Sequence, residues 1–359
     1  MTPEDVTRTG VTPGGGTPRG VAPGGVTPGG VTPRGATPGG VTPAGVTAAI
    51  ATPAIEITGL SYSYGSVRAI SGLDLRVEAN EMFALVGPDG AGKTTAIRLL
   101  CGILKPSAGN VRVFGRDLQR ELPWVKEQIG YLSQRFSLYG DLTVDENIEF
   151  FARIHGVADF QDRRQELLSF TRLLPFRSRL ADRLSGGMKQ KLALACTLVH
   201  RPRIIFLDEP TTGVDPVSRR EFWIILSQLL REGITILMST PYLDEAERAS
   251  RVGLMNAGRL MAAESPARIK AAMKGSVLEI ICADIRRASA VLRRLGELRE
   301  VQLFGDRLNA VAVDAQAGEQ AARAALDAEG IQVTSLRVIP SSLENAFISL
   351  IRSESEVAT

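Results

Sequence analysis

The fold of this chain is decided by the stretch Gly87-Pro88-Asp89-Gly90-Ala91-Gly92-Lys93-Thr94-Thr95. It fits the phosphate-loop spacing G-x-x-x-x-G-K-[ST], with an apolar run (residues 82–86) before it and a helix-forming segment (residues 95–100) after it. Glycines let the backbone curl so that successive N–H groups point inward at an anion, and the following helix adds its N-terminus. We therefore expect all nine residues to bind a nucleotide, with Lys93 on the β- and γ-phosphates and the Thr94 hydroxyl on Mg²⁺.

A second stretch, Leu184-Ser185-Gly186-Gly187-Met188-Lys189-Gln190, lies about a hundred residues downstream of that loop. Ser185 is a favourable N-cap residue, so a helix is expected to begin here. The two glycines would leave N–H groups open at the helix N-terminus, which can then bind a phosphate. Many unrelated NTPases carry a phosphate loop alone, and this second motif restricts the choice to one family.

The third motif is Ile204-Ile205-Phe206-Leu207-Asp208-Glu209, followed by Pro210. Four apolar residues that end in two carboxylates predict a buried parallel strand. Such strands deliver side chains to their C-terminal edge, where ligands bind in open α/β sheets. Asp208 is expected to orient Mg²⁺.

Together the three motifs make the chain resemble the ATP-binding subunit of an ABC-2-type, drug-type ABC transporter, over roughly residues 54–351. It is most similar to the first ATPase half of duplicated efflux ATPases. The resemblance implies ATP and Mg²⁺ as cofactors and Glu209 as the general base that polarises the attacking water. It also implies that Gln134 contacts Mg²⁺ and that Tyr64 stacks on adenine, with Tyr62 as the competing aromatic.

In this family two ATPase domains meet head to tail, so that each signature motif covers the nucleotide of the other domain. By resemblance, four residues here would bind the second domain's ATP: Ser185, Gly186, Gly187 and Gln190. Asp215 matches a loop that touches the opposite subunit. The chain therefore implies a dimer, with itself or, preferably, with a similar chain.

Two residues depart from the family pattern. Asn is commoner at the position of Asp89, whose negative charge should weaken triphosphate binding a little. Pro241 stands where family members usually have a histidine that contacts the γ-phosphate, and proline has no side-chain donor. We expect His155 and His200 to be solvated or structural rather than substitutes. The chain's own ATP site is therefore expected to be impaired.

Composition divides the chain into parts. Residues 1–53 repeat Val-Thr-Pro-Gly-Gly with almost no large apolar side chains, and are expected to be disordered, as a neutral tail or an overextended start. Residues 54–275 alternate apolar strands with helical stretches, and the resemblance implies an α/β ABC ATPase domain here, RecA-like with a helical subdomain at about 136–195. Within that subdomain, Thr143-Val144-Asp145-Glu146 predicts the capping-box start of a helix. Residues 276–351 show strand, helix, strand, strand, helix, strand, which is the ferredoxin-like order, and residues 352–359 would be a tail.

Composition also bears on partners. Lys and Arg number 42 against 39 Asp and Glu, so a formal charge of +3 gives no argument for nucleic acid. No apolar run approaches eighteen residues, so we expect that the chain does not span a membrane. The resemblance implies a peripheral protein on the cytoplasmic side of the inner (plasma) membrane, with an ABC-2 membrane permease as partner. Three separated cysteines suit a reducing cytosol. The alternatives are a soluble non-transport ABC ATPase, or an ATP-binding regulatory module with little hydrolysis.

Overall fold

The computed structural model describes residues 52–135 and 138–357, with side chains described up to residue 352. Residues 1–51, on which the prediction of a disordered repeat falls, lie outside the described residues, as do the last two residues of the predicted tail. Within the described part of the chain, no helix combines the length and the apolar character that crossing a bilayer requires.

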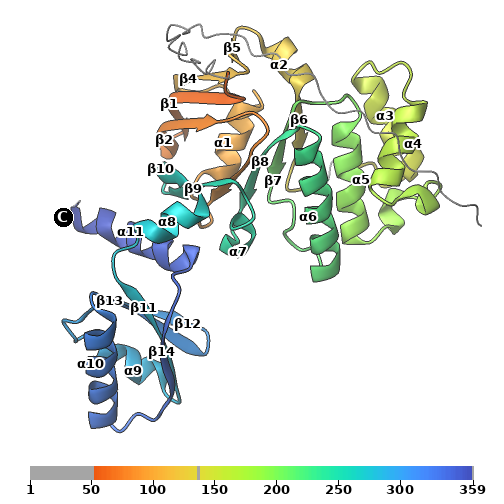
Figure 1. Ribbon diagram of the computed structural model, residues 1–359. Coiled ribbons are helices and arrows are strands. Elements are labelled where there is room, and N and C mark those ends of the chain that lie inside the picture. Colours follow the sequence, from red (N-terminus) through yellow and green to blue (C-terminus); the bar gives the residue numbers. More distant parts are fainter. Residues whose placement is uncertain (1–51, 136–137, 358–359) are drawn as a thin grey trace, which may run out of the picture. The chain divides into compact units, whose positions relative to one another are not determined.

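A six-stranded sheet forms the centre of the larger domain, in the order β10-β9-β3-β8-β7-β6 (Figure 1). Parallel pairing joins the five strands from β9 to β6, and β10 runs antiparallel to β9. Three of these strands are completely buried, as their apolar sequences predict. In sequence order the strands are β3 (Met82–Val86), β6 (Ile129–Leu132), β7 (Ile204–Asp208), β8 (Thr235–Thr240), β9 (Arg251–Asn256) and β10 (Arg259–Glu264).

The two faces of this sheet pack into separate hydrophobic cores. Phe83 and Leu85 of β3 face α1 (Lys93–Leu100), whereas Ala84 and Val86 face α5 (Gly186–Leu198) and α6 (Pro216–Arg231). This division follows from the period of two along a strand. A smaller antiparallel sheet, β2-β1-β4-β5, closes the core on the α1 side. Its strands are β1 (Ile55–Tyr64), β2 (Val67–Val77), β4 (Ala108–Val113) and β5 (Arg116–Asp117), and α2 (Leu122–Gln128) precedes β6.

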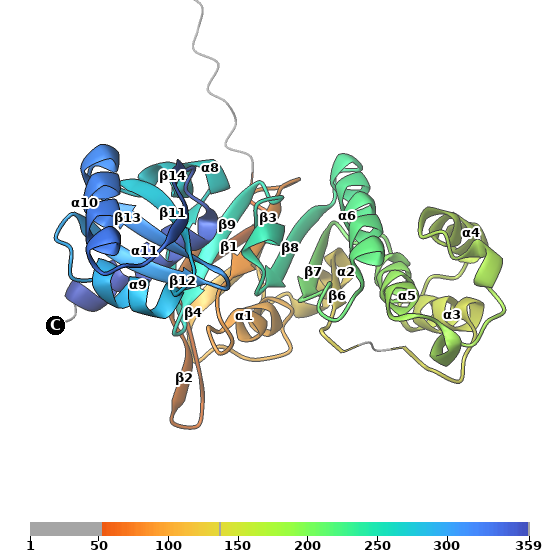
Figure 2. The ribbon, with the colours of Figure 1, turned by 90° about the horizontal axis from the view of Figure 1, so that it is seen from below.

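The helical part begins at a capping box, as predicted. The Thr143 hydroxyl accepts a hydrogen bond from the Glu146 N–H at 3.2 Å, and the Glu146 carboxylate accepts one from the Thr143 N–H at 2.7 Å. The hydrogen bonds that the Glu146 carboxylate accepts from the Thr143 N–H and from the Thr143 hydroxyl lower its pKa. Helices α3 (Val144–Ile154) and α4 (Gln161–Phe170) and two 3₁₀ turns (Leu174–Phe176 and Ala181–Arg183) lead to α5. In Figures 1 and 2, α3, α4 and α5 lie together at the β6 end of the six-stranded sheet.

A smaller domain follows α7 (Leu243–Ala246) and α8 (Pro266–Ala272). Its elements occur in the order strand, helix, strand, strand, helix, strand, which agrees with the order predicted from the sequence. All its strand pairs are antiparallel, in the sheet order β12-β13-β11-β14. In chain order, the strands and helices of this domain are β11 (Ser276–Cys282), α9 (Ile285–Leu292), β12 (Leu298–Phe304), β13 (Arg307–Ala312), α10 (Ala315–Ala328) and β14 (Val333–Ile339).

The last helix, α11 (Leu343–Val357), connects the two domains. Leu343 and Phe347 belong to the hydrophobic core of the larger domain, and α11 contacts α7 and α8. On its other side Asn345 is fully buried and donates a hydrogen bond to Gln302 of β12 at 3.2 Å. The domain boundary predicted at residue 351 falls inside α11. This helix packs against distant parts of the chain, which the local sequence pattern does not specify.

Candidate nucleotide site

The phosphate loop connects the buried strand β3 to α1. Gly92 is the N-cap of α1 with φ of 101°, a left-handed conformation that favours glycine. At Gly87 a Cβ atom would lie 2.2 Å from the carbonyl oxygen of Met255, so a side chain does not fit there. The loop therefore needs these glycines for two different reasons, one of backbone conformation and one of close approach.

Lys93 is only 4% exposed and is already hydrogen-bonded within the loop. Its ammonium donates to the carbonyl oxygens of Gly87 at 2.7 Å and Pro88 at 3.0 Å. It also lies 3.8 Å from a carboxylate oxygen of Glu209. The structure thus places Lys93 of the phosphate loop beside Glu209 of the third motif.

Asp208 ends β7 beside the loop. Its Oδ1 accepts hydrogen bonds from the Thr94 hydroxyl at 2.9 Å and from the Ser239 hydroxyl at 2.7 Å. Its Oδ2 is buried and has no hydrogen-bond partner among the described residues. A buried carboxylate oxygen without a partner is costly, and a cation or its bound water removes that cost. The donor set of Thr94 and Asp208 therefore fits Mg²⁺, which prefers hydroxyl, carboxylate and water oxygens.

Glu209 follows Asp208 in an unusual backbone conformation, with φ of 49°. Such a conformation is uncommon for a residue with a side chain and persists where surrounding contacts hold it. Here the Glu209 N–H donates to the Ser239 hydroxyl at 3.0 Å, and the Glu209 carboxylate accepts from the Gln134 amide at 2.9 Å. The carboxylate is thereby turned toward Lys93 and Gln134, where a general base for water would be needed.

Ser239 is a site residue that the sequence analysis missed. It is the residue before the last one of β8, is paired with Asp208 in the parallel register, and is completely buried. Its hydroxyl bonds to Asp208 and to the Glu209 N–H at once. A signal was available, because a serine at the C-terminal end of an apolar run should lie beside the carboxylates of a neighbouring parallel strand.

Pro241 lies between Thr240 and Glu245, whose side chains are hydrogen-bonded to each other. The carboxylate of Glu245, 2% exposed, accepts hydrogen bonds from Thr240 at 2.9 Å and Thr211 at 2.7 Å. Arg219 lies 3.4 Å from the same carboxylate. Glu245 was also missed by the sequence analysis. Its network holds the side chain of Thr240, which directly precedes position 241, and that of Thr211.

The two histidines of the chain form a pair elsewhere. The rings of His155 and His200 stack with centroids 3.9 Å apart and an interplanar angle of 8°. The Nε2 of His200 lies 2.9 Å from the carbonyl oxygen of Ile129, and because a carbonyl can only accept, this nitrogen carries the proton. Burial, and then the charge of His155, lower the pKa of His200 to about 4. His155 is exposed and His200 is half-buried, in agreement with the expectation that the two would be solvated or structural.

The second motif forms a capped helix N-terminus. The Ser185 hydroxyl accepts from the Met188 N–H at 3.3 Å, and Ser185 and Gly186 are exposed. A Cβ atom at Gly187 would lie 2.2 Å from the Ser218 hydroxyl of α6, so this glycine is required for packing. Gln190, which was expected to bind the second domain's ATP, is only 3% exposed.

Tyr62 and Tyr64, the two aromatic residues considered for adenine stacking, differ in their exposure. Tyr64 ends β1 and is 46% exposed, whereas Tyr62 packs against the core beneath it. Their rings meet edge to face, 4.9 Å apart. Tyr64 therefore presents the accessible ring, and its contact with adenine stays a prediction.

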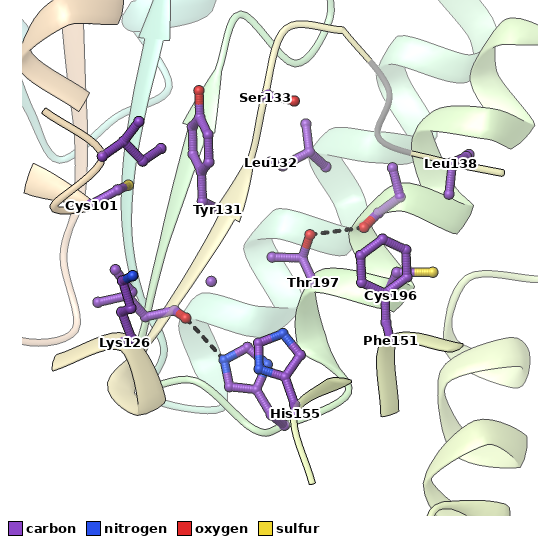
Figure 3. A pocket seen from close by; sticks show the side chains of 15 residues that line it. Cys101, Lys126, Tyr131, Leu132, Ser133, Leu138, Phe151, His155, Cys196 and Thr197 are labelled. Carbon is purple, nitrogen blue, oxygen red and sulfur yellow. Dashed lines mark hydrogen bonds between the residues drawn. The ribbon is translucent and has the colours of Figure 1, made fainter. Parts of the chain in front are cut away.

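A groove with a volume of about 270 Å³ lies between β6, α3 and α5 (Figure 3). Tyr131, Leu138 and Phe151 line it together with the stacked histidines. The segment from Tyr131 to Gln134 lines this groove at Ser133 and reaches the Glu209 carboxylate through Gln134. The groove and the carboxylate are thus joined by consecutive residues.

Comparison with known proteins gives consistent results. A family model described as ABC transporter matches residues 70–212. The chain is 40% identical over 219 residues to the probable multidrug ABC transporter ATP-binding protein YbhF of Escherichia coli, a match that covers 60% of this chain and 38% of that protein. It is 36% identical over 303 residues to the daunorubicin/doxorubicin resistance ATP-binding protein DrrA of Streptomyces peucetius, covering 82% of this chain and 92% of DrrA.

Among solved structures, the fold is similar to the dimeric post-hydrolysis state of the ATP-binding cassette MJ0796 bound to ADP and Pi. The TM-score is 0.54 at 25% identity, and the match covers 59% of this chain and 98% of the solved chain. The similarity to YbhF involves well under half of that protein, whereas the similarity to DrrA extends over nearly all of it. DrrA-like relatives therefore share the larger domain and also most of the chain on its C-terminal side.

Proposed function

Since the chain belongs to the family of ABC transporter ATP-binding proteins, we propose that it is the ATP-hydrolysing subunit of an ABC-2-type membrane exporter. The observation that carries the proposal is the constellation around Glu209. Its carboxylate lies 2.9 Å from Gln134 and 3.8 Å from Lys93, on a backbone held in a left-handed conformation. Such an arrangement suits a base that must meet a water beside the γ-phosphate, and a module that only binds ATP has no need of it.

In the proposed mechanism the phosphate loop holds ATP by its N–H groups and by Lys93, which exchanges its loop carbonyls for phosphate oxygens. Thr94 and Asp208 would hold Mg²⁺, which neutralises charge on the β- and γ-phosphates. Glu209 orients and polarises the attacking water. Ser239 keeps Asp208 and Glu209 in position through its two hydrogen bonds.

The active unit is proposed to be a dimer, preferably with a different ATPase chain. Ser185 and Gly186 present an open helix N-terminus on the surface, far along the chain from the loop. A relative of this fold is described as a dimer bound to ADP and Pi. Because Pro241 lacks a donor, this chain would complete a productive site on its partner's ATP while it hydrolyses its own slowly.

The substrate is proposed to be a drug or another amphipathic compound, since relatives are named for multidrug transport and for daunorubicin and doxorubicin resistance. The membrane permease would seat a cytoplasmic segment in the groove lined by Tyr131 and Phe151. Gln134, which donates a hydrogen bond to Glu209, would then couple occupation of that groove to the position of the Glu209 carboxylate. The chain would act at the cytoplasmic side of the membrane, with residues 276–351 as a ferredoxin-like accessory domain.

The test is to co-express the chain with the permease and the second ATPase that the proposal requires, and to compare Glu209→Gln here with the equivalent change in the partner. We expect the change here to cost little of the complex's ATPase activity and the partner change to cost most of it. Glu232→Gln, an exposed site at the end of α6, serves as the matched control. Vigorous hydrolysis by the isolated chain, removed by Glu209→Gln, would instead identify an active homodimer.

A further inference from the structure

A second cavity, of about 470 Å³, lies where the larger and smaller domains meet. Its apolar walls come from three places: Ile269 and Met273 at α8, Ala346 and Leu350 of α11, and Val311 of β13. Residues 50–359 form one compact unit, so the walls belong to a single body. Neither the nucleotide site nor the groove beside β6 shares any of these residues. The volume is in the range of small-molecule sites.

Charge around this cavity is unbalanced. Four cationic side chains line it against two carboxylates, Glu264 and Glu300. Two of the cations are already paired: Arg268 lies 3.4 Å from Glu264, and Arg352 lies 3.2 Å from Glu300. Lys274 and Arg299 have no side-chain hydrogen bond or ion pair with any residue in the described ranges.

The carboxylate of Glu300, which could neutralise Lys274 and Arg299, is already bonded to other residues. Glu300 is 5% exposed and accepts a hydrogen bond from Gln302 at 2.8 Å in addition to its pair with Arg352. Gln302 is in turn bonded to the buried Asn345 of α11. This chain of contacts fixes the wall of the cavity and leaves two positive charges at its rim without a counterion.

We propose that this cavity binds a small amphipathic anion, meaning a carboxylate, sulfonate or phosphate ester that carries an apolar body. The anionic head meets Lys274 and Arg299, and the apolar body packs against Ile269, Met273 and Leu350. Guanidinium and ammonium groups favour such heads because the hydrogen bonds are charge-assisted. Bound there, the ligand contacts both domains and α11 at once, so it stabilises their junction. The proposal stands apart from the assignment as an exporter subunit.

The experiment uses the full chain with excess Mg²⁺ and ADP, so that the nucleotide site is occupied. The anionic probe is 8-anilinonaphthalene-1-sulfonate, and N-phenyl-1-naphthylamine is its uncharged counterpart. The doubly substituted variant Lys274→Gln, Arg299→Gln is compared with Arg286→Gln, Arg294→Gln, two exposed cations of the smaller domain that lie outside the cavity. Both pairs are exposed, so both variants keep the fold.

We expect saturable binding of one sulfonate probe, weakened about fivefold or more by the first variant and less than about twofold by the second. The uncharged probe should bind both variants as it binds the parent chain. Decanoate should displace the sulfonate, whereas inorganic phosphate at equal ionic strength should not. Unchanged affinity in the cavity variant, equal losses in both variants, or displacement by phosphate as effective as by decanoate would each overturn the proposal.

Discussion

Replacement of Ser239 by alanine removes one hydroxyl and two hydrogen bonds at the centre of the nucleotide site. The bond to Asp208 is 2.7 Å long, buried and charge-assisted, which makes it worth about 1.5–3 kcal/mol. Asp208 keeps Thr94, and the Glu209 N–H keeps a backbone bond to the Ser239 carbonyl at 3.2 Å. We therefore expect the loss to fall on the positioning of the two carboxylates, with kcat lowered about ten- to a hundredfold.

The assay is the slow ATP hydrolysis by the isolated chain, which reports on its own site, as a function of Mg²⁺ concentration, with thermal unfolding measured in parallel. Ser227→Ala is the control, because its hydroxyl donates at 2.9 Å to the Trp223 carbonyl in α6 and touches neither carboxylate. The Ser239 variant should need more Mg²⁺ for half-maximal rate, whereas the control should not. Parental kcat and parental Mg²⁺ dependence in the Ser239 variant would refute the positioning role.

Four further outcomes are expected. Lys93→Ala should weaken Mg²⁺–ATP binding roughly tenfold or more in calorimetry, because a charge-assisted contact is lost; equal affinities would contradict the loop assignment. Pro241→His should raise the ATPase rate of the isolated chain, by up to about a hundredfold, since one transition-state donor is restored. Deleting residues 1–50 should leave the melting temperature and ATP binding unchanged, because the repeat has no core to lose. The pKa of His200 in the folded chain, about 4, lies below its ordinary value of 6.5, so the unfolded chain binds that proton more tightly. The free energy of unfolding, from urea titrations, should therefore fall between pH 6.5 and 4, and His200→Gln should flatten this fall.

Sequence reasoning succeeded where a short motif carries its own geometry. The phosphate loop, the capping box at Thr143 and the buried strand before Asp208 are local patterns, and the structure has each of them. The resemblance to a family gave Gln134 as a contact of Mg²⁺, and its hydrogen bond to Glu209 was not anticipated. Spacing alone does not bring together two residues that are 75 positions apart.

The features that the sequence did not reveal depend on packing between distant elements. Gln190 is buried, and Gly187 lies close to Ser218 of α6, neither of which a pattern within the motif indicates. Glu245 becomes a buried acceptor only when Thr211 and Thr240 meet it from two different segments. The cavity between the domains exists because α11 returns to the larger domain, and a helix pattern does not say where its apolar face will bind.

The contacts of Lys93 affect how measured affinities for nucleotide should be understood. Its ammonium donates to the carbonyl oxygens of Gly87 and Pro88 and lies beside the Glu209 carboxylate, so a phosphate that contacts Lys93 exchanges partners with these groups rather than adding a simple gain. The affinity then reports the difference between the new partners and the old ones. Replacing Glu209 by glutamine weakens one of the old partners and so favours ATP even where hydrolysis is already slow. Accumulation of ATP on such a variant therefore has two sources: slower hydrolysis, and weaker competition from Glu209 for the Lys93 ammonium.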